Sequence, residues 1–374
     1  MRPVDTLALP LGDGWVLCQS DIDQLAVVNA TGKIVWDLLD GGFGQDEIAS
    51  AFALHFGVAA QGALANIRAM IGRLEEAGFL ARPIADASTA GYTPVQPGPD
   101  VDCGTLRFGA RRIRIYSPLA EVGSAYFARF GHRALDYVVD ADVLAFSAGS
   151  GNYRLTFQDE TVADVNSPAE LIGRAHELIL SWEHPKTEFL AYYHAAAVSR
   201  SGHSALLPGV SAIGKSTLTA YLVGHGFAYL GDDCIAMART DWSLRPLPTC
   251  LSLKSGSWPL LSELYPELSH LPTVHYHGRE ARYVEPRQAQ YSGRAPSVIL
   301  FPSYVKDGET SLRALVPLQT MARLIETNTD LHQPATRATL AEFLQFVERT
   351  PAYELVYRDL ASAKAAIEDW LEHA

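Results

Sequence analysis

Nine consecutive residues near the middle of the chain, GVSAIGKST, fit the phosphate-binding pattern G-x-x-x-x-G-K-[ST]. Its glycines allow backbone conformations that a Cβ would block, so the amides of the loop and of the following helix can point at one anion. The lysine places a cation on the β- and γ-phosphates, and the next hydroxyl is a ligand for Mg²⁺. Apolar residues precede the loop and a helical pattern follows it, as a phosphate loop requires. The alternative interpretation is an ordinary β–α turn that contains glycine. The sequence therefore predicts an α/β domain that binds ATP and Mg²⁺ through Gly209, Val210, Ser211, Ala212, Ile213, Gly214, Lys215, Ser216 and Thr217.

Two adjacent carboxylates, Asp232 and Asp233, follow the apolar run FAYLG about one helix after the loop. Carboxylates at the end of a strand beside a phosphate loop can hold Mg²⁺ and accept a proton from a hydroxyl. The alternative is a solvated turn, where aspartate is common. Because the phosphate loop is present, we expect the pair to be functional.

Four further residues are candidates for the same site. His194 lies on a predicted strand two elements before the loop, although a lone histidine there is more often a packed one. Lys254, Arg279 and Arg282 can meet anionic groups of a substrate. Their alternative role is to offset an acidic surface.

The charge of the chain restricts its partners. The 374 residues contain 42 acidic and 30 basic side chains, a formal net charge of −12. Such a chain is a poor electrostatic match for nucleic acid or for an anionic membrane surface. The sequence has no apolar run of the roughly 20 residues that cross a bilayer and no signal-peptide pattern. The four cysteines contain no CxxC pair, so we expect free thiols and a cytoplasmic location.

A segment rich in proline, glycine and small polar residues, 83–104, reads as a linker. Before it, residues 1–82 predict a small sheet followed by three helices. After it, residues 105–190 predict accessory strands and a helix, and residues 191–374 predict the nucleotide-binding domain. The expected fold is therefore multidomain, combining α/β and α+β parts.

The stretch from His194 to Met237 resembles the kinase domain of HPr kinase/phosphorylase and its phosphoenolpyruvate-carboxykinase-like relatives. In that family a strand bearing a histidine precedes the phosphate loop, and the next helix leads to a strand ending in an Asp pair. The matching parts here are YYHAAAV, the loop, LTAYLVGHG and YLGDDCIAM. The later segments LSLKSGS and SVILFPSY resemble a subgroup of HPr-kinase-related kinases. Two departures are S-A-I-G-K in place of the usual S-G-x-G-K, and His194-Ala195 in place of His-Gly.

The resemblance implies a role for each matching residue. Lys215 and Ser216 would bind the phosphates and Mg²⁺. Asp232 would be the general base and Asp233 would assist the metal. His194 would lie beside the aspartates and tune them.

The first 82 residues resemble a PqqD-like domain, also called a RiPP recognition element, which has a winged-helix-like fold with a three-stranded sheet and three helices. The segments AVVNATGKIVWDLLDGG, DEIASAF and IRAMIGRLEEAGFL follow its pattern, and we expect Thr31 to cap the first helix. Such domains add an extended leader peptide as a strand to a sheet edge, against the last helix. The resemblance places the leader against Ile22, Leu25, Val27, Ile67 and Ile71. The alternative is a scaffold that only packs on the kinase.

Together these patterns predict an ATP- and Mg²⁺-dependent kinase for a Ser or Thr hydroxyl of a ribosomally synthesised precursor peptide. One alternative is a kinase of a small hydroxylated metabolite. Another is a non-catalytic, nucleotide-gated module that binds peptides. The sequence leaves open the donor (ATP, GTP or pyrophosphate) and a homo-oligomeric state, which related kinase domains often adopt.

Overall fold

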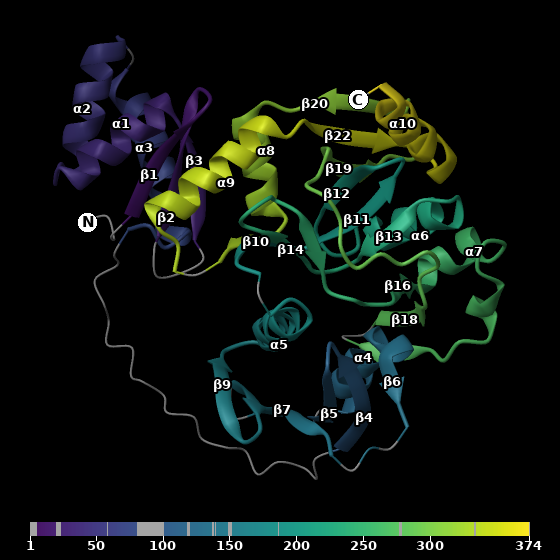
Figure 1. The fold of residues 1–374 in the computed structure, drawn as a ribbon. Helices are drawn as coiled ribbons and strands as arrows, with labels where there is room; N and C mark the ends of the chain where they lie inside the picture. Colours follow the sequence, from purple (N-terminus) through teal and green to yellow (C-terminus); the bar gives the residue numbers. More distant parts are fainter. Residues whose placement is uncertain are drawn as a thin grey trace. The chain divides into compact units, whose positions relative to one another are not determined.

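The computed structural model describes residues 6–19, 24–57, 59–80, 101–117, 120–136, 138, 140–148, 152–185, 187–276, 279–332 and 334–373. The chain is a mixed α/β protein, as expected, and it divides into two units. One unit joins residues 1–88 to residues 314–353, and the other joins residues 89–313 to residues 354–374 (Figure 1). The segment 314–353, which the sequence places with the nucleotide-binding domain, therefore belongs with the N-terminal residues.

The first unit begins with an antiparallel sheet in the order β1-β2-β3, followed by three helices. One face of the sheet packs on these helices around Leu17, Trp36, Ile71 and Phe79. Asn29, and not Thr31, caps the first helix, because its side-chain oxygen accepts a hydrogen bond of 2.8 Å from the amide of Gly32. The elements are β1 (Thr6–Leu11), β2 (Gly14–Gln19), β3 (Leu25–Asn29), α1 (Ala30–Asp40), α2 (Gln45–Phe56) and α3 (Ala60–Glu76).

The other face of this sheet is covered by helices from the distant segment 314–353. Helix α8 (Pro317–Glu326) contacts β3, and α9 (Arg337–Arg349) contacts β1, with β21 (Thr329–Leu331) between them in the chain. The approach is close, because a Cβ added to Gly14 would lie 2.5 Å from a methyl carbon of Leu318. Four apolar side chains are buried on this face: Leu9, Leu11, Val16 and Cys18.

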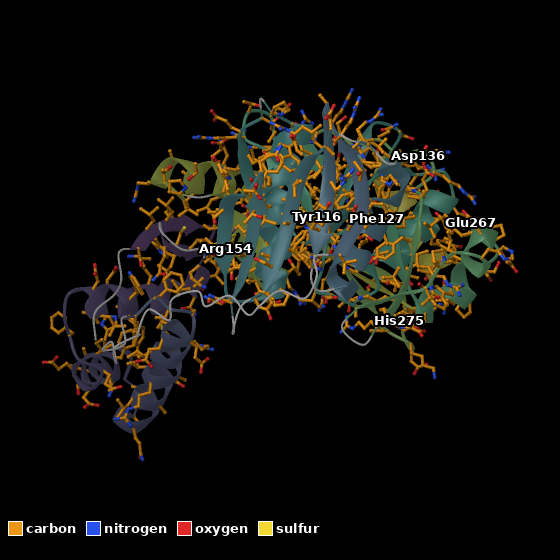
Figure 2. The ribbon with its side chains drawn as sticks, turned by 90° about the horizontal axis from the view of Figure 1, so that it is seen from below. Tyr116, Phe127, Asp136, Arg154, Glu267 and His275 are labelled. Atoms are coloured by element: carbon orange, nitrogen blue, oxygen red, sulfur yellow. The ribbon has the colours of Figure 1, made fainter. Side chains whose placement is uncertain are left out.

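The second unit starts with a six-stranded sheet in the order β6-β4-β5-β7-β8-β9. Its strands are antiparallel apart from the parallel pair β5 and β7. Phe127 lies over Gly104, where a Cβ would approach within 2.6 Å of its ring (Figure 2). Ser167 caps α5 with Pro168 in the first turn. The elements are β4 (Val101–Phe108), β5 (Arg111–Ser117), α4 (Ala120–Arg129), β6 (Ala134–Leu135), β7 (Asp142–Ala148), β8 (Tyr153–Phe157), β9 (Glu160–Val165) and α5 (Pro168–Glu183).

The phosphate loop belongs to a second six-stranded sheet of this unit, in the order β13-β11-β12-β19-β22-β20. Three alanines, Ala195 to Ala197, are fully buried on β11. Strand β12 pairs with β11 antiparallel and with β19 parallel, and it leads into the loop and then α6. The elements are β11 (Ala195–Arg200), β12 (His203–Pro208), α6 (Lys215–Gly224), β13 (Ala228–Gly231), β19 (Val298–Tyr304), β20 (Ser311–Ala314), β22 (Ala352–Tyr357) and α10 (Leu360–His373).

Two smaller groups of strands complete this unit. In one, β14 lies between β10 and β15, and in the other β18 lies between β16 and β17. The elements are β10 (Phe189–Tyr193), β14 (Ile235–Ala238), β15 (Leu244–Pro246), β16 (Leu251–Lys254), α7 (Trp258–Leu261), β17 (Val274–Tyr276) and β18 (Arg279–Val284). Within the described residues, no helix is both long and apolar enough to span a bilayer.

Candidate nucleotide-binding site

The phosphate loop runs from the end of β12 to the start of α6. Its geometry depends on residues with a positive φ, namely Gly214 at +99°, which is the N-cap of α6, and Ala212 at +74°. Gly209 is required for space, because a Cβ there would lie 2.9 Å from Ile213 and 3.2 Å from the side chain of Lys215. The start of α6 directs its free amides and its positive dipole end toward the loop. The loop is therefore built to hold an anion.

Lys215 is buried and folded back onto the loop. Its ammonium donates hydrogen bonds to the carbonyl oxygens of Gly209 and Val210, the second at 3.2 Å. It also lies 3.1 Å from Nε2 of His194. Burial lowers the pKa of Lys215, and the nearby aspartates partly oppose this shift. An anion in the loop would compete for this cation with the carbonyl groups that hold it here.

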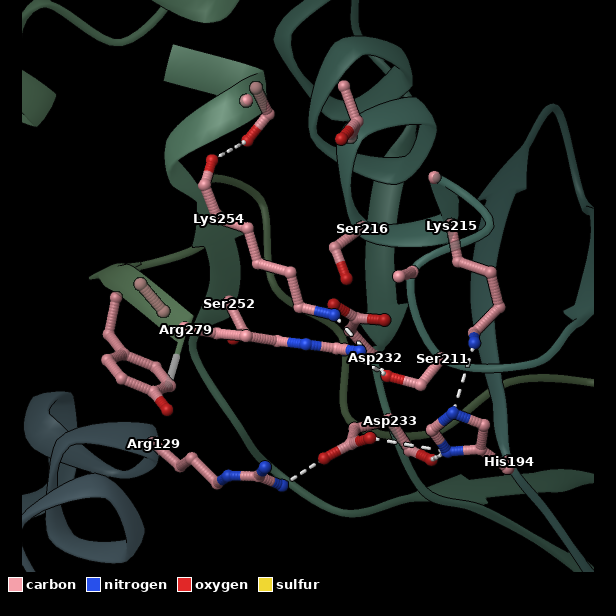
Figure 3. A pocket seen from close by; sticks show the side chains of 17 residues that line it. Arg129, His194, Ser211, Lys215, Ser216, Asp232, Asp233, Ser252, Lys254 and Arg279 are labelled. Atoms are coloured by element: carbon pink, nitrogen blue, oxygen red, sulfur yellow. Dashed lines mark hydrogen bonds and ion pairs between the residues drawn. The ribbon is translucent and has the colours of Figure 1, made fainter. Parts of the chain in front are cut away.

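The two aspartates follow β13 and contact different partners (Figure 3). Asp232 is buried and accepts a hydrogen bond from the hydroxyl of Ser216, while its Oδ2 has no hydrogen-bond partner among the described residues. Burial raises the pKa of Asp232 to about 6. A buried carboxylate oxygen without a partner is costly, so this atom is suited to receive a proton or a cation.

Asp233 has a φ of +84°, a backbone conformation that is uncommon for a residue other than glycine. Its carboxylate pairs with Arg129 and lies 3.3 Å from Nδ1 of His194. Burial acts to raise the pKa of Asp233, but the charge of Arg129 outweighs it and holds the pKa well below its usual range. Asp233 is therefore charged at neutral pH, and His194 links it to Lys215.

A cavity of about 610 Å³ joins these groups to the basic residues of β16 and β18. Lys254 and Arg279 each lie 3.3 Å from the hydroxyl of Ser211, so both cations reach the phosphate loop (Figure 3). Arg282 does not line this cavity. Its guanidinium donates to the carbonyl of Leu268 and lies 4.0 Å over the ring of Trp258. Arg282 therefore has no place in the substrate site proposed below.

Two contributors to the site carry no signal in the sequence. Arg129 comes from the last turn of α4, more than 100 residues before its partner Asp233. The hydroxyl of Thr249 donates to the backbone carbonyl of Asp232 at 2.9 Å and so helps to fix it. Both contacts are made by the tertiary fold, which brings residues from separate strands and helices to the phosphate loop.

The donor set fits a magnesium ion shared with a nucleotide. Among the described residues, no group of three or more His, Cys, Asp and Glu side chains could hold a metal by itself. Magnesium commonly takes only one or two carboxylates and completes its shell with phosphate oxygens and water. Ser216 and one carboxylate of the adjacent aspartates, which line the same cavity, match that requirement.

The predicted leader-binding residues lie in the first unit. Ile22 is outside the described residues. Leu25 and Val27 are half-buried on β3, the edge strand of the sheet, and they share a face with Val16. Ile67 and Ile71 are each only 4% exposed and belong to the core between sheet and helices. Both side chains face the interior of the unit, so neither presents a surface to a leader peptide.

The comparisons with known proteins bear first on this unit. Residues 14–80 match the model of the family described as Coenzyme PQQ synthesis protein D (PqqD). The first unit contains a PqqD domain. This match confirms the resemblance of the PqqD segment that the sequence suggests.

Two solved structures are similar to parts of the chain. One is TbiB1 in complex with the TbiA(beta) leader peptide, with 23% identity, a TM-score of 0.21 and coverage of 23% of this chain and 100% of that chain. The other is the HPr(Ser) kinase/phosphatase from Coxiella burnetii, with 9% identity, a TM-score of 0.26 and coverage of 49% of this chain and 97% of that chain. No curated protein matches the chain.

Proposed function

We propose that this protein is a kinase that transfers the γ-phosphoryl group of ATP to a Ser or Thr hydroxyl of a precursor peptide, whose leader the PqqD domain binds. The observation that carries the proposal is the meeting of Lys215, Ser216 and Asp232 in one cavity. A phosphate loop alone would support nucleotide binding. A buried carboxylate with a raised pKa beside that loop adds a proton acceptor.

In the proposed reaction, the acceptor hydroxyl gives its proton to Oδ2 of Asp232. Its oxygen forms a bond to the γ-phosphorus while the bond to the bridging oxygen of ADP breaks. Lys215, Lys254 and Arg279 surround the loop and would neutralise charge on the transferred group. Magnesium, when bound, would polarise the phosphate oxygens.

The roles of the neighbouring residues follow from their contacts. His194 lies between Asp233 and Lys215, so it would hold both in position. A role of Asp233 as a metal ligand requires that Arg129 release it when nucleotide binds. Titration of Mg²⁺ into Asp233→Asn in the presence of ATP tests this role. If Asp233 is a ligand, the variant should bind Mg²⁺ more weakly than the wild type does.

The peptide part of the proposal rests on the PqqD domain. Strand β3 lies at an edge of the small sheet, where its outer backbone groups are suited to pair with an added strand. Binding of the leader there would raise the effective concentration of the acceptor hydroxyl at the kinase site. An enzyme with weak activity toward free hydroxyls could then still phosphorylate the tethered peptide selectively.

The test is incubation of the full chain with Mg²⁺, ATP and the precursor peptide encoded beside its gene. We expect the peptide to gain the mass of one phosphate, and Lys215→Ala to abolish the gain. Lys306→Ala, which removes an exposed lysine, is the matched control and should behave as the wild type. The same peptide without its leader should react much more slowly. Equal rates with and without the leader would contradict the peptide-kinase assignment.

A further inference from the structure

A second cavity, of about 580 Å³, lies against the phosphate loop. Ala212, Gly214 and Thr217 line both this cavity and the one that contains the aspartates. Asp232, Asp233 and Lys215 are absent from the residues that line the second cavity. The two cavities therefore meet at the loop, and only one of them contains the groups proposed for phosphoryl transfer.

The second cavity has an aromatic and apolar lining. Tyr304 at the end of β19 and Tyr357 at the end of β22 lie edge to face, with ring centroids 5.9 Å apart. Tyr221 contributes a third ring, one turn after Thr217 on α6. Tyr304 is 57% exposed and Leu260 on α7 is 63% exposed, so two large side chains of this lining lie open to solvent.

The loop approaches this aromatic group directly. A Cβ added to Gly214 would lie 3.3 Å from the hydroxyl of Tyr357, so this hydroxyl lies close to the backbone that begins α6. Tyr357 is buried, and burial raises its pKa to about 12, which keeps the phenol neutral at ordinary pH. The charged side chains of the lining, Arg358 and Asp359, lie 3.3 Å from each other. A cavity with a paired charge and three tyrosines suits an uncharged, planar group.

We propose that this cavity binds the base of a nucleoside triphosphate whose phosphates lie in the loop. The inference rests on the proposed function and adds the place where the base of the donor lies. With the terminal phosphate at Lys215 and the aspartates, the nucleoside must leave the loop at its other side. Gly214 and Thr217 lie where the two cavities meet, so a nucleoside that leaves the loop there enters the aromatic cavity. A volume of this size is within the usual range of small-molecule sites, about 300–1,000 Å³.

The inference distinguishes between donors. Stacking of a base on an aromatic side chain commonly contributes about 1–3 kcal/mol, which corresponds to about 5- to 150-fold in affinity. Pyrophosphate and inorganic triphosphate have no base and would gain nothing from the tyrosines. A nucleoside triphosphate should therefore bind more tightly than inorganic triphosphate, and the difference should depend on Tyr304.

The test is calorimetric titration of the full chain with ATP, GTP and inorganic triphosphate, each with Mg²⁺. We expect ATP or GTP to bind at least about tenfold more tightly than triphosphate. Tyr304→Ala should remove most of that difference and leave triphosphate binding unchanged, whereas Tyr304→Phe should keep it. Val162→Ala, at an exposed position of β9, is the control for a neutral surface change.

Two outcomes would overturn the inference in different ways. Equal affinity for all three ligands, lost in Lys215→Ala, would show that the loop binds phosphates but that the cavity takes no base. The proposed kinase could then still use a donor without a base. If the wild type bound none of the three ligands, the proposed kinase function itself would be contradicted. Photolabelling with 8-azido-ATP supplies an independent measurement, with the label expected within 298–304 or 357–361.

Discussion

The guanidinium of Arg129 pairs with the carboxylate of Asp233, although α4 packs on the sheet that contains β4 and β5, and the strand before Asp233 belongs to the phosphate-loop sheet. This ion pair fixes one aspartate of the adjacent pair. Asp232 is left to face Ser216 and the phosphate loop. The segment before the phosphate-loop sheet thus supplies Arg129 to the candidate site and does more than precede that site in the chain.

Arg129→Ala should destabilise the second unit by about 1–3 kcal/mol, because it leaves a mostly buried carboxylate without its cation. Urea unfolding of the full chain measures this loss. Arg154→Ala is the matched control, since its ion pair with Asp164 on β8 and β9 is more exposed (Figure 2). That control should cost less than about 1 kcal/mol. An equal loss of unfolding free energy in the two variants would show that the Arg129 pair stabilises the protein no more than an exposed ion pair does.

Asp232→Asn should separate catalysis from stability. Loss of the proton acceptor is expected to slow phosphoryl transfer by about 10²–10⁴-fold while ATP still binds. The same change removes a buried charge whose pKa is raised by burial, so the ligand-free protein should become more stable at pH 7. Single-turnover kinetics and thermal unfolding without Mg²⁺ measure the two effects. A variant that retains full activity would remove Asp232 from the reaction.

His176 should make the second unit sensitive to acid. The ring is buried against Tyr126, and burial lowers its pKa to about 3. Below about pH 6.5 the unfolded chain takes up a proton that the folded chain does not, so this contribution to stability is complete above pH 6.5 and is lost as the pH falls toward 3. Between pH 7 and pH 5 the free energy of unfolding should fall by about 2 kcal/mol from this group.

Urea unfolding at the two pH values measures that change. His176→Phe should reduce the pH dependence, because the variant has no proton to bind at this position. His275→Gln, at an exposed position on β17, should leave it as in the wild type. An unchanged pH dependence in His176→Phe would assign the acid sensitivity to other groups.

Gly14→Ala should weaken the first unit by about 1–3 kcal/mol. The added methyl would lie 2.5 Å from Leu318 on α8 and 2.7 Å from the carbonyl oxygen of Val28, so either the helix or the sheet must shift. Gly62→Ala on α3 is the control, because nothing lies within 4 Å of its Cβ position and alanine favours a helix. Thermal unfolding should therefore move in opposite directions for the two variants.

The local parts of this molecule could be predicted from sequence, and the long-range parts could not. The phosphate loop and the aspartates follow from short patterns whose geometry is set within a few residues. By contrast, Arg129 and Tyr357 reach the loop only through the order of strands in two sheets. The sequence also does not predict that Ile71 is buried. An apolar stripe on a helix shows which residues share a face, but not which element packs on that face.

Capping shows the same limit on a smaller scale. Asn29 and Thr31 are both good N-cap residues, and two positions separate them. Only the end of β3 decides between them, because the strand continues to Asn29 and the helix starts directly afterwards. The sequence therefore predicts this helix but places its first residue too late.

The helices on the second face of the small sheet have a consequence for synthesis of the chain. The ribosome makes the strands of the PqqD domain within the first 30 residues, but their apolar partners on α8 and α9 only after residue 316. During most of translation, the side chains of Leu9, Leu11 and Val16 lack these packing partners, so they are exposed or bound by a chaperone. The first unit is thus among the last parts of the protein to be completed, and a fragment that ends at residue 82 would lack the helices that cover one face of its sheet.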